Sequence, residues 1–196
     1  NCKKEIFIKS LKKSDFIIVS PGININKSLL KKYLVKNSQK IITDLDLYYM
    51  MNSNTKSIVV TGTNGKSTTC KIIEHLLRKN KFDVKLGGNI GKPILDLKIE
   101  KTTIVIIEAS SFQLAYSKFI KPTYSIILNI TKDHLDWHGN MKNYLNAKFK
   151  IFSLQDNKEY AILKDKNIIK IFKKKNFSSK LKTVNNNSYN SVKIKI

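Results

Sequence analysis

The segment Val59 to Thr68, V-V-T-G-T-N-G-K-S-T, constrains the fold of this chain more than any other. An apolar run ends there in two glycines, a lysine and several hydroxyl residues, and a helical pattern follows. Such a turn binds anions, because glycine lets backbone N–H groups come close and the helix dipole favours negative charge. The sequence therefore predicts a phosphate-binding loop made of Gly62, Thr63, Asn64, Gly65, Lys66, Ser67 and Thr68.

Within this loop, Lys66 can reach a terminal phosphate and the Ser67 hydroxyl can ligate Mg²⁺. Only Thr63 and Asn64 separate the two glycines, whereas the standard P-loop has four residues there, so the loop is a shortened variant. The alternative is an ordinary turn with a surface lysine. The strand before the loop and the helix after it favour the phosphate-binding interpretation.

Apolar runs alternate with helical patterns along the middle of the chain. We expect strands at 58–60, 84–86, 103–107 and 124–128, which indicates a parallel sheet covered on both faces. The helix predicted at 66–80 should carry its apolar face on Ile72, Ile73, Leu76 and Leu77. Ligands of such sheets bind beyond the carboxyl ends of the strands. The phosphate loop, Glu108 and the loop 129–136 all fall at such ends, which predicts one shared site.

The residues before the phosphate loop predict a separate unit. Residues 16–19 and 41–42 are expected to form strands, and residues 29–34 and 45–51 helices. Gly22 could let the backbone approach a ligand diphosphate, and a plain strand-to-helix turn is equally compatible with the sequence. The polar segment 52–55 predicts a boundary between domains at 1–53 and 54–196.

The end of the chain continues the sheet pattern. A helix is expected at 140–152 with Met141, Leu145, Phe149 and Phe152 on one stripe. Lys148 lies on that stripe, where it is either buried with a partner or snorkels to water. Residues 159–164, 168–172 and 192–196 are predicted to be strands.

Two further side chains are candidate metal ligands. Glu108 ends a strand opposite the phosphate loop, which suits Mg²⁺; a solvated loop carboxylate is the alternative. His134 lies between Asp133 and Asp136, so it either binds a metal or is held by those carboxylates.

The charge pattern raises one other class of function. The formal net charge is +23, which is compatible with nucleic-acid binding. However, Arg78 is the only arginine among 37 basic residues, and lysines occur in every segment. Because arginine is preferred for bidentate phosphate and base contacts, we favour a compositional bias and expect no specific nucleic acid. No apolar run approaches 18 residues, so no membrane helix is expected, and Cys2 and Cys70 are expected to be free thiols of a cytoplasmic protein.

Five segments in the same order resemble the Mur ligase family of ATP-dependent amino-acid ligases. They are T-G-T-N-G-K-S-T at 61–68, G-G-N-I-G at 87–91, E-A-S-S-F-Q-L at 108–114, N-I-T-K-D-H-L-D at 129–136 and N-A-K-F-K-I-F at 146–152. The resemblance implies a P-loop-type ATPase domain preceded by the end of a Rossmann-like UDP-binding domain. The second and third motifs are most similar to the bacterial member that joins D-glutamate to UDP-N-acetylmuramoyl-L-alanine in peptidoglycan precursor synthesis.

The resemblance also implies roles for individual residues. Lys66, Lys148 and His134 would be catalytic. Ser67 and Glu108 would hold one Mg²⁺, and His134 a second one together with a CO₂-derived carbamate on Lys148. Gly22, Asn89, Ser110 and Gln113 would face the UDP-sugar. The protein is expected to be a monomer, and the chain an internal fragment that is inactive alone. Another Mur-type or folylpolyglutamate-type ligase, or a nucleotide-binding fragment without ligase activity, are the alternatives.

Overall fold

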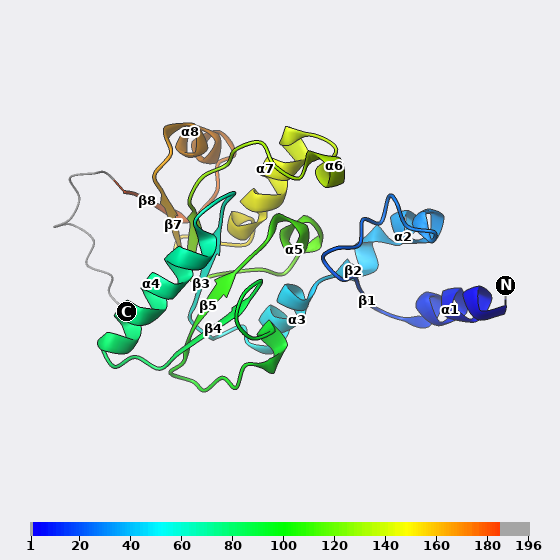
Figure 1. Ribbon diagram of the computed structural model, residues 1–196, viewed down its shortest axis with the longest axis horizontal. Helices are drawn as coiled ribbons and strands as arrows, with labels where there is room; N and C mark the ends of the chain where they lie inside the picture. Colours follow the sequence, from blue (N-terminus) through cyan, green and yellow to red (C-terminus); the bar gives the residue numbers. More distant parts are fainter. Residues whose placement is uncertain (1, 185–196) are drawn as a thin grey trace.

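The computed structural model of the chain describes residues 2–184 and has a six-stranded sheet at its centre (Figure 1). The strand order is β4-β5-β3-β6-β7-β8, and every neighbouring pair is parallel. The strands are β3 (Ser57–Thr61), β4 (Val84–Gly88), β5 (Ile104–Glu108), β6 (Tyr124–Ile127), β7 (Tyr160–Leu163) and β8 (Lys180–Thr183). The predicted α/β class with a mostly parallel sheet is therefore confirmed. The strand predicted at 192–196 lies outside the described residues.

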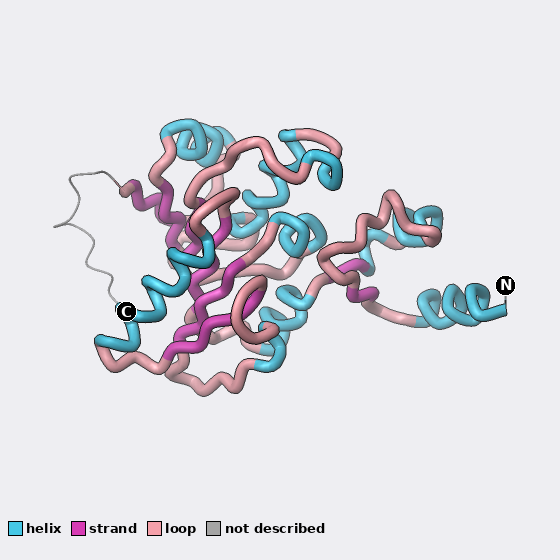
Figure 2. The backbone as a smooth tube through the Cα atoms, in the orientation of Figure 1, coloured by secondary structure: helices cyan, strands magenta, loops and turns pink. Residues whose placement is uncertain are grey.

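Helices connect the strands and lie outside the sheet (Figure 2). They are α3 (Asp44–Met51), α4 (Lys66–Lys79), α5 (Ser111–Tyr116), α6 (Leu135–His138), α7 (Met141–Phe149) and α8 (Lys166–Lys174), with 3-10 turns η2 (Ile94–Asp96) and η3 (Lys150–Phe152). From β3 to β4 the chain crosses the sheet in one direction, and from β5 through β6 and β7 to β8 in the other. Right-handed crossovers therefore place α4 on one face and α5, α7 and α8 on the opposite face.

Each face of the sheet has its own apolar core. On the first face, Val59, Ile107 and Ile127 pack against Leu114 and Phe152. On the second face, residues of β3, β4 and β5 pack against α4; they are Val60, Val84, Ile104 and Ile106 of the strands and Cys70 and Leu77 of the helix. All five residues of β5 are buried, which explains why its sequence is an uninterrupted apolar run up to Glu108.

A smaller unit precedes the sheet. Strands β1 (Ile17–Ile18) and β2 (Ile41–Ile42) form a parallel pair, and α2 (Lys31–Lys36) and η1 (Ser38–Lys40) lie between them in the chain. Helix α1 (Cys2–Lys13) extends away from the body of the protein (Figure 1). Helix α3 follows β2 in the sequence but packs in the core of the large sheet, where Leu45 and Tyr48 are buried. The domain boundary at 53–54 stays a prediction.

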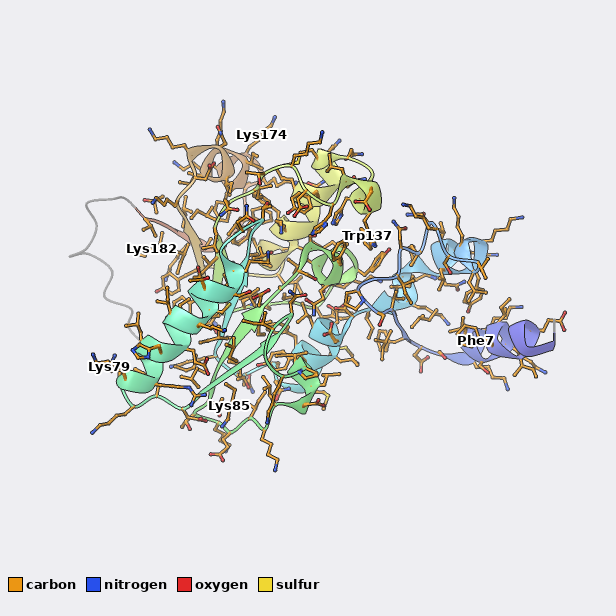
Figure 3. All side chains as sticks on the ribbon, viewed as in Figure 1. Phe7, Lys79, Lys85, Trp137, Lys174 and Lys182 are labelled. Atoms are coloured by element: carbon orange, nitrogen blue, oxygen red, sulfur yellow. The ribbon has the colours of Figure 1, made fainter. Side chains whose placement is uncertain are left out.

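The small unit contacts the body at α6, at α5 and at Lys118 after α5, whose ammonium group donates to the backbone oxygens of Ser38 and Gln39 (2.7 and 2.8 Å). The Asn24 side chain donates to the Trp137 backbone oxygen (2.8 Å), and Lys27 donates to that of Asp136 (2.8 Å). The Tyr116 hydroxyl of α5 accepts a bond from the Ile25 backbone N–H (3.0 Å). Figure 3 shows Trp137 at this junction.

One predicted strand is wrong. Residues 168–172 lie inside helix α8, whose N-terminus is capped by Asp165. The Asp165 carboxylate accepts bonds from the backbone N–H groups of Asn167 and Ile168, at 2.8 and 3.0 Å. Ile168 and Phe172, one helical turn apart, are then both buried.

The apolar stripe predicted on α4 is half correct. Leu77 is buried and Ile73 packs against the core, whereas Ile72 and Leu76 are 54% and 52% exposed. Each exposed residue lies one position, or about 100° around the helix, from its buried neighbour. The fold therefore leaves an apolar strip on the side of α4.

Two glycines give a matched test of backbone strain. A Cβ at Gly88, where φ is +101°, would lie 2.5 Å from the Glu108 backbone oxygen. We expect Gly88→Ala to lower the free energy of unfolding by about 3 kcal/mol. At Gly139 φ is +81° but the space is open, so Gly139→Ala should cost only about 1 kcal/mol. Urea unfolding measures both, and equal losses would contradict this account.

Among the residues that the structure describes, no helix is long and apolar enough to span a membrane. Cys70 is a free, buried thiol, as the sequence predicts.

Candidate active site

The phosphate-binding loop follows β3 directly and leads into α4. Gly62 has φ +157°, and Gly65, at the N-cap of α4, has φ +82°, a left-handed conformation that glycine adopts without strain. A Cβ at Gly62 would lie 3.1 Å from the Leu128 Cβ. The loop thus passes close to the end of β6. The first backbone N–H groups of the 14-residue helix α4 have no side-chain cap and point towards the loop.

Asn129, at the end of β6, fixes the conformation of this loop. Its side-chain oxygen accepts from the Asn64 backbone N–H (2.9 Å), and its side-chain nitrogen donates to the Asn64 oxygen (3.1 Å). Its backbone oxygen accepts from the Thr63 N–H (2.9 Å). The loop is therefore held in shape by the protein itself.

Two lysines converge on one carbonyl oxygen of the loop. Lys66 donates to the oxygens of Gly62 and Thr63 at 3.0 and 2.8 Å, and Lys148 of α7 donates to Gly62 O at 2.8 Å. Lys148 is only 1% exposed, which excludes the snorkelling alternative. Burial, followed by the positive charge of Lys66, lowers the pKa of Lys148 to about 7. No carboxylate forms a salt bridge with either ammonium group within the described chain.

Tyr144 joins the loop to Lys148, and the sequence did not point to it. Its hydroxyl lies 3.0 Å from Thr63 Oγ1, and the Lys148 Nζ lies 4.7 Å from the centre of its ring. The only signal in the sequence was its spacing, because Tyr144 precedes Lys148 by one helical turn.

Glu108 links two of the predicted elements of the site. Ser67 Oγ donates to one of its carboxylate oxygens (2.7 Å) and the Asn89 side chain donates to the other (2.8 Å). These contacts exist because β5 lies between β3 and β4, so the ends of the three strands meet. Carboxylate and hydroxyl oxygens are the donors that Mg²⁺ prefers, and Mg²⁺ usually completes its shell with water and substrate phosphates. The Ser67–Glu108 pair therefore fits a magnesium ion beside the phosphate loop.

His134 lies at the start of α6 with a left-handed backbone (φ 51°). Its ring nitrogen is 3.3 Å from the Asp133 carboxylate, and its ring packs 4.7 Å from that of Phe112. Its role as a metal ligand stays a prediction. His138 is buried, hydrogen-bonded to Ser111 (3.0 Å), and burial lowers its pKa to about 4.

Two of the residues predicted to bind substrate, Ser110 and Gln113, form hydrogen bonds within the protein. The Ser110 hydroxyl accepts from the Gln113 backbone N–H (3.2 Å), and the Gln113 side chain accepts from Ser110 N–H (3.1 Å), which forms a capping box at α5. Gln113 also donates to Asp44 of α3 (3.1 Å). Gly22 lies in an exposed turn with open space around it. A role of these residues in substrate binding stays a prediction.

The depressed pKa of Lys148 predicts a pH-dependent stability. Its folded pKa of about 7 lies below the ordinary value of 10.5, so between these values the unfolded chain binds more protons. The free energy of unfolding should therefore rise with pH in this window. We expect Lys148→Met to stabilise the chain relative to the parent below pH 7, and this gain to shrink towards pH 10.5. Urea unfolding across this range measures it, with the exposed Lys142→Met as control; a gain independent of pH would contradict it.

Comparisons with known proteins agree with this geometry. The D-glutamate ligase (UDP-N-acetylmuramoylalanine--D-glutamate ligase) of Rickettsia bellii is 43% identical over 150 residues, which are 76% of this chain and 33% of the relative. That of Caldicellulosiruptor saccharolyticus is 40% identical over 161 residues, 80% of this chain and 35% of the relative. The chain thus spans about a third of the length of these curated relatives.

A solved structure shows the same fold. It is a UDP-N-acetylmuramate:L-alanyl-gamma-D-glutamyl-meso-diaminopimelate ligase from Neisseria meningitides, with a TM-score of 0.59 and 13% identity over 90% of this chain and 60% of that one.

A parallel α/β sheet with a glycine-rich phosphate loop at a strand end defines a P-loop-type nucleotide-binding domain. The family described as Mur ligase middle domain matches residues 60–195, and the chain belongs to the Mur ligase family.

Proposed function

We propose that this chain forms the central part of an ATP-dependent ligase that adds D-glutamate to UDP-N-acetylmuramoyl-L-alanine. The observation that carries the proposal is the phosphate loop, where Lys66 lies over Gly62 O and Thr63 O at the N-terminus of α4 and Ser67 bonds Glu108. An ammonium group without a carboxylate partner, beside the free N–H groups of a helix N-terminus, favours a bound anion. The β- and γ-phosphates of ATP supply that anion, and with it the negative charge that no carboxylate of the described residues provides.

The residues of the loop then have separable roles. Backbone N–H groups at the start of α4 bind phosphate oxygens, and Lys66 neutralises the charge that develops on the transferred γ-phosphoryl group. Ser67 and Glu108 would hold Mg²⁺, which supplies further charge neutralisation when bound. Catalysis of this type consists mainly of positioning and electrostatic stabilisation.

We also propose that Lys148 carries a CO₂-derived carbamate. With a pKa of about 7, an appreciable fraction of its amine is neutral at neutral pH and can react with CO₂. The neutral nitrogen attacks the CO₂ carbon and releases one proton to solvent, so the uncharged amine becomes an anion with two oxygens. Such a group suits a hard metal ion, which His134 would also ligate.

The proposed reaction has two steps. The substrate carboxylate attacks the γ-phosphorus of ATP, which releases ADP and gives an acyl phosphate. The amine of D-glutamate then attacks the acyl carbon, releases phosphate and forms the amide. Asn89, Ser110, Gln113 and Gly22 are proposed to face the UDP-sugar; Asn89 already lies beside Glu108.

A chimera tests the proposal, because the segment that this chain shares with the relatives is only about a third of their length. Residues 14–165 would replace the aligned segment of the Rickettsia bellii relative. We expect ADP release that requires both UDP-N-acetylmuramoyl-L-alanine and D-glutamate. Activity only with a different amino acid would favour another Mur-type ligase. A folded chimera that binds Mg-ATP without turnover would favour a nucleotide-binding fragment.

A further inference from the structure

The Thr63 side chain of the phosphate loop is a meeting point of three segments of the site. Its hydroxyl accepts a bond from the Thr131 backbone N–H (3.0 Å) and donates to the Thr131 backbone oxygen (3.3 Å). It also lies 3.0 Å from the Tyr144 hydroxyl of α7. One hydroxyl group therefore bonds the phosphate loop both to the loop that carries His134 and to the helix that carries Lys148.

The direction of these bonds follows from the donors and acceptors present. A threonine hydroxyl has one hydrogen to donate and two lone pairs that accept. The Thr131 N–H occupies one lone pair, and the Thr131 carbonyl oxygen, which can only accept, takes the hydrogen. The remaining lone pair of Thr63 accepts the O–H of Tyr144, so Tyr144 is the donor in this pair. The bonding capacity of the Thr63 hydroxyl is thus fully used.

The Tyr144 ring lies between this bond and Lys148. The residue is only 1% exposed, and the His138 ring packs edge-on against it with the ring centres 5.2 Å apart. Tyr144 precedes Lys148 by one turn of α7, and the Lys148 Nζ lies 4.7 Å from the centre of the Tyr144 ring. A cation over an aromatic face is attracted to it. The ring therefore limits where the Lys148 head group can lie.

Two side chains of α7 bond the phosphate loop within residues 2–184. Lys148 donates to Gly62 O (2.8 Å), and Tyr144 donates to Thr63. The first bond changes when Lys148 is modified, because a carbamate nitrogen has fewer hydrogens to donate than an ammonium group. The second bond involves no atom of Lys148. The bond of Tyr144 is therefore the one that can hold α7 against the loop in both forms of the lysine.

We propose that Tyr144 is a positioning residue, which sets Lys148 against the phosphate loop through its bond to Thr63. The inference rests on the proposed function, in which Lys148 acts beside a nucleotide bound at the loop. Asn129 maintains the shape of the loop itself. Loss of the Tyr144 hydroxyl should therefore change the placement of Lys148 and leave the affinity for Mg-ATP unchanged.

Acylation of Lys148 tests this placement without any measurement of activity. The 196-residue chain is treated with N-hydroxysuccinimidyl acetate, and peptide mass spectrometry gives the rate at Lys148 relative to the exposed Lys142. Because Lys148 is 1% exposed, it reacts only after local opening. We expect Tyr144→Phe to raise this rate about fivefold, which corresponds to the loss of one hydrogen bond. Tyr48→Phe is the matched control and should not change it, because the buried Tyr48 hydroxyl has no hydrogen-bond partner among the described residues.

Substitutions of Thr63 separate the hydrogen bond from packing. Thr63→Ser keeps the hydroxyl and should react like the parent, whereas Thr63→Val removes it at nearly the same size and should raise the rate at Lys148. In the Thr63→Val background, Tyr144→Phe should have no further effect, since its partner is already absent. Additive effects of the two substitutions, or an unchanged rate in Tyr144→Phe, would overturn the proposal.

Kinetics of the chimera test the consequence for the reaction. Tyr144→Phe should lower kcat about tenfold, because Lys148 is misplaced, and change the Kd of Mg-ATP by less than about twofold. A general loss of stability would not produce this split. A normal kcat in Tyr144→Phe would overturn the positioning role. An inactive parent chimera, together with the expected acylation rates, would refute the proposed function while supporting the placement of Lys148 by Tyr144.

Discussion

Lys66→Ala in the chimera is expected to lower D-glutamate-dependent ADP release by about 10³-fold or more, because a charge that stabilises the transferred phosphoryl group is lost. The fold should survive, since the Lys66 side chain donates only to two carbonyl oxygens of its own loop. Steady-state rates at saturating ATP measure the effect.

Lys71→Ala is the matched control for this experiment. Lys71 is an exposed lysine on the same helix, outside the phosphate loop. We expect its replacement to leave the rate unchanged. A cooperatively folding Lys66→Ala variant with near-normal turnover would refute the assignment of the phosphate loop.

Lys148→Ala is expected to lower the same rate by about 10²- to 10³-fold, because the variant can form no carbamate. Acetate should restore part of the rate, since a carboxylate can occupy the vacated space and supply the missing negative charge. Acetamide, which has nearly the same size but no charge, should not. Lys142→Ala on the same helix is the control, and it should be insensitive to both additives.

Removal of bicarbonate gives an independent test of the carbamate. The rate of the parent chimera should fall when dissolved CO₂ is removed and recover when bicarbonate is returned, most clearly below pH 7, where a larger fraction of the amine is protonated. An unchanged rate at every pH would refute the carbamate and leave Lys148 as a buried amine that binds the loop.

The sequence did not predict β8 (Lys180–Thr183), whose residues are mostly exposed, but it predicted β3 to β7, which are wholly or partly buried. Such strands read as local apolar runs, and β5 ends at Glu108 as expected. The error at 168–172 has a related cause, since this stretch is apolar except for Lys170 and five residues are too few to distinguish a helical period from a strand. The Asp165 cap was the available signal that a helix begins there.

The candidate site was predictable where it depends on strand order. Parallel strands bring their carboxyl ends together, so the meeting of Ser67 with Glu108 follows from the fold. The contacts of Tyr144 and the bonds of Asn129 to Asn64 depend on tertiary packing, which no local pattern reports. The exposure of Ile72 likewise depends on how α4 is rotated over the sheet.

The placement of α3 has a consequence for recombination between members of this family. Its residues Leu45, Tyr48 and Tyr49 are fully or almost fully buried in the core of the large sheet, and the Asp46 carboxylate accepts bonds from the backbone N–H groups of Lys118 and Phe119 (both 2.7 Å). A crossover in the polar segment 52–55 would therefore pair this helix with a foreign core and foreign bonding partners. Exchanges that begin before Thr43 keep the helix with the sheet that it covers, so sequence exchange between homologous genes should be tolerated best at that position.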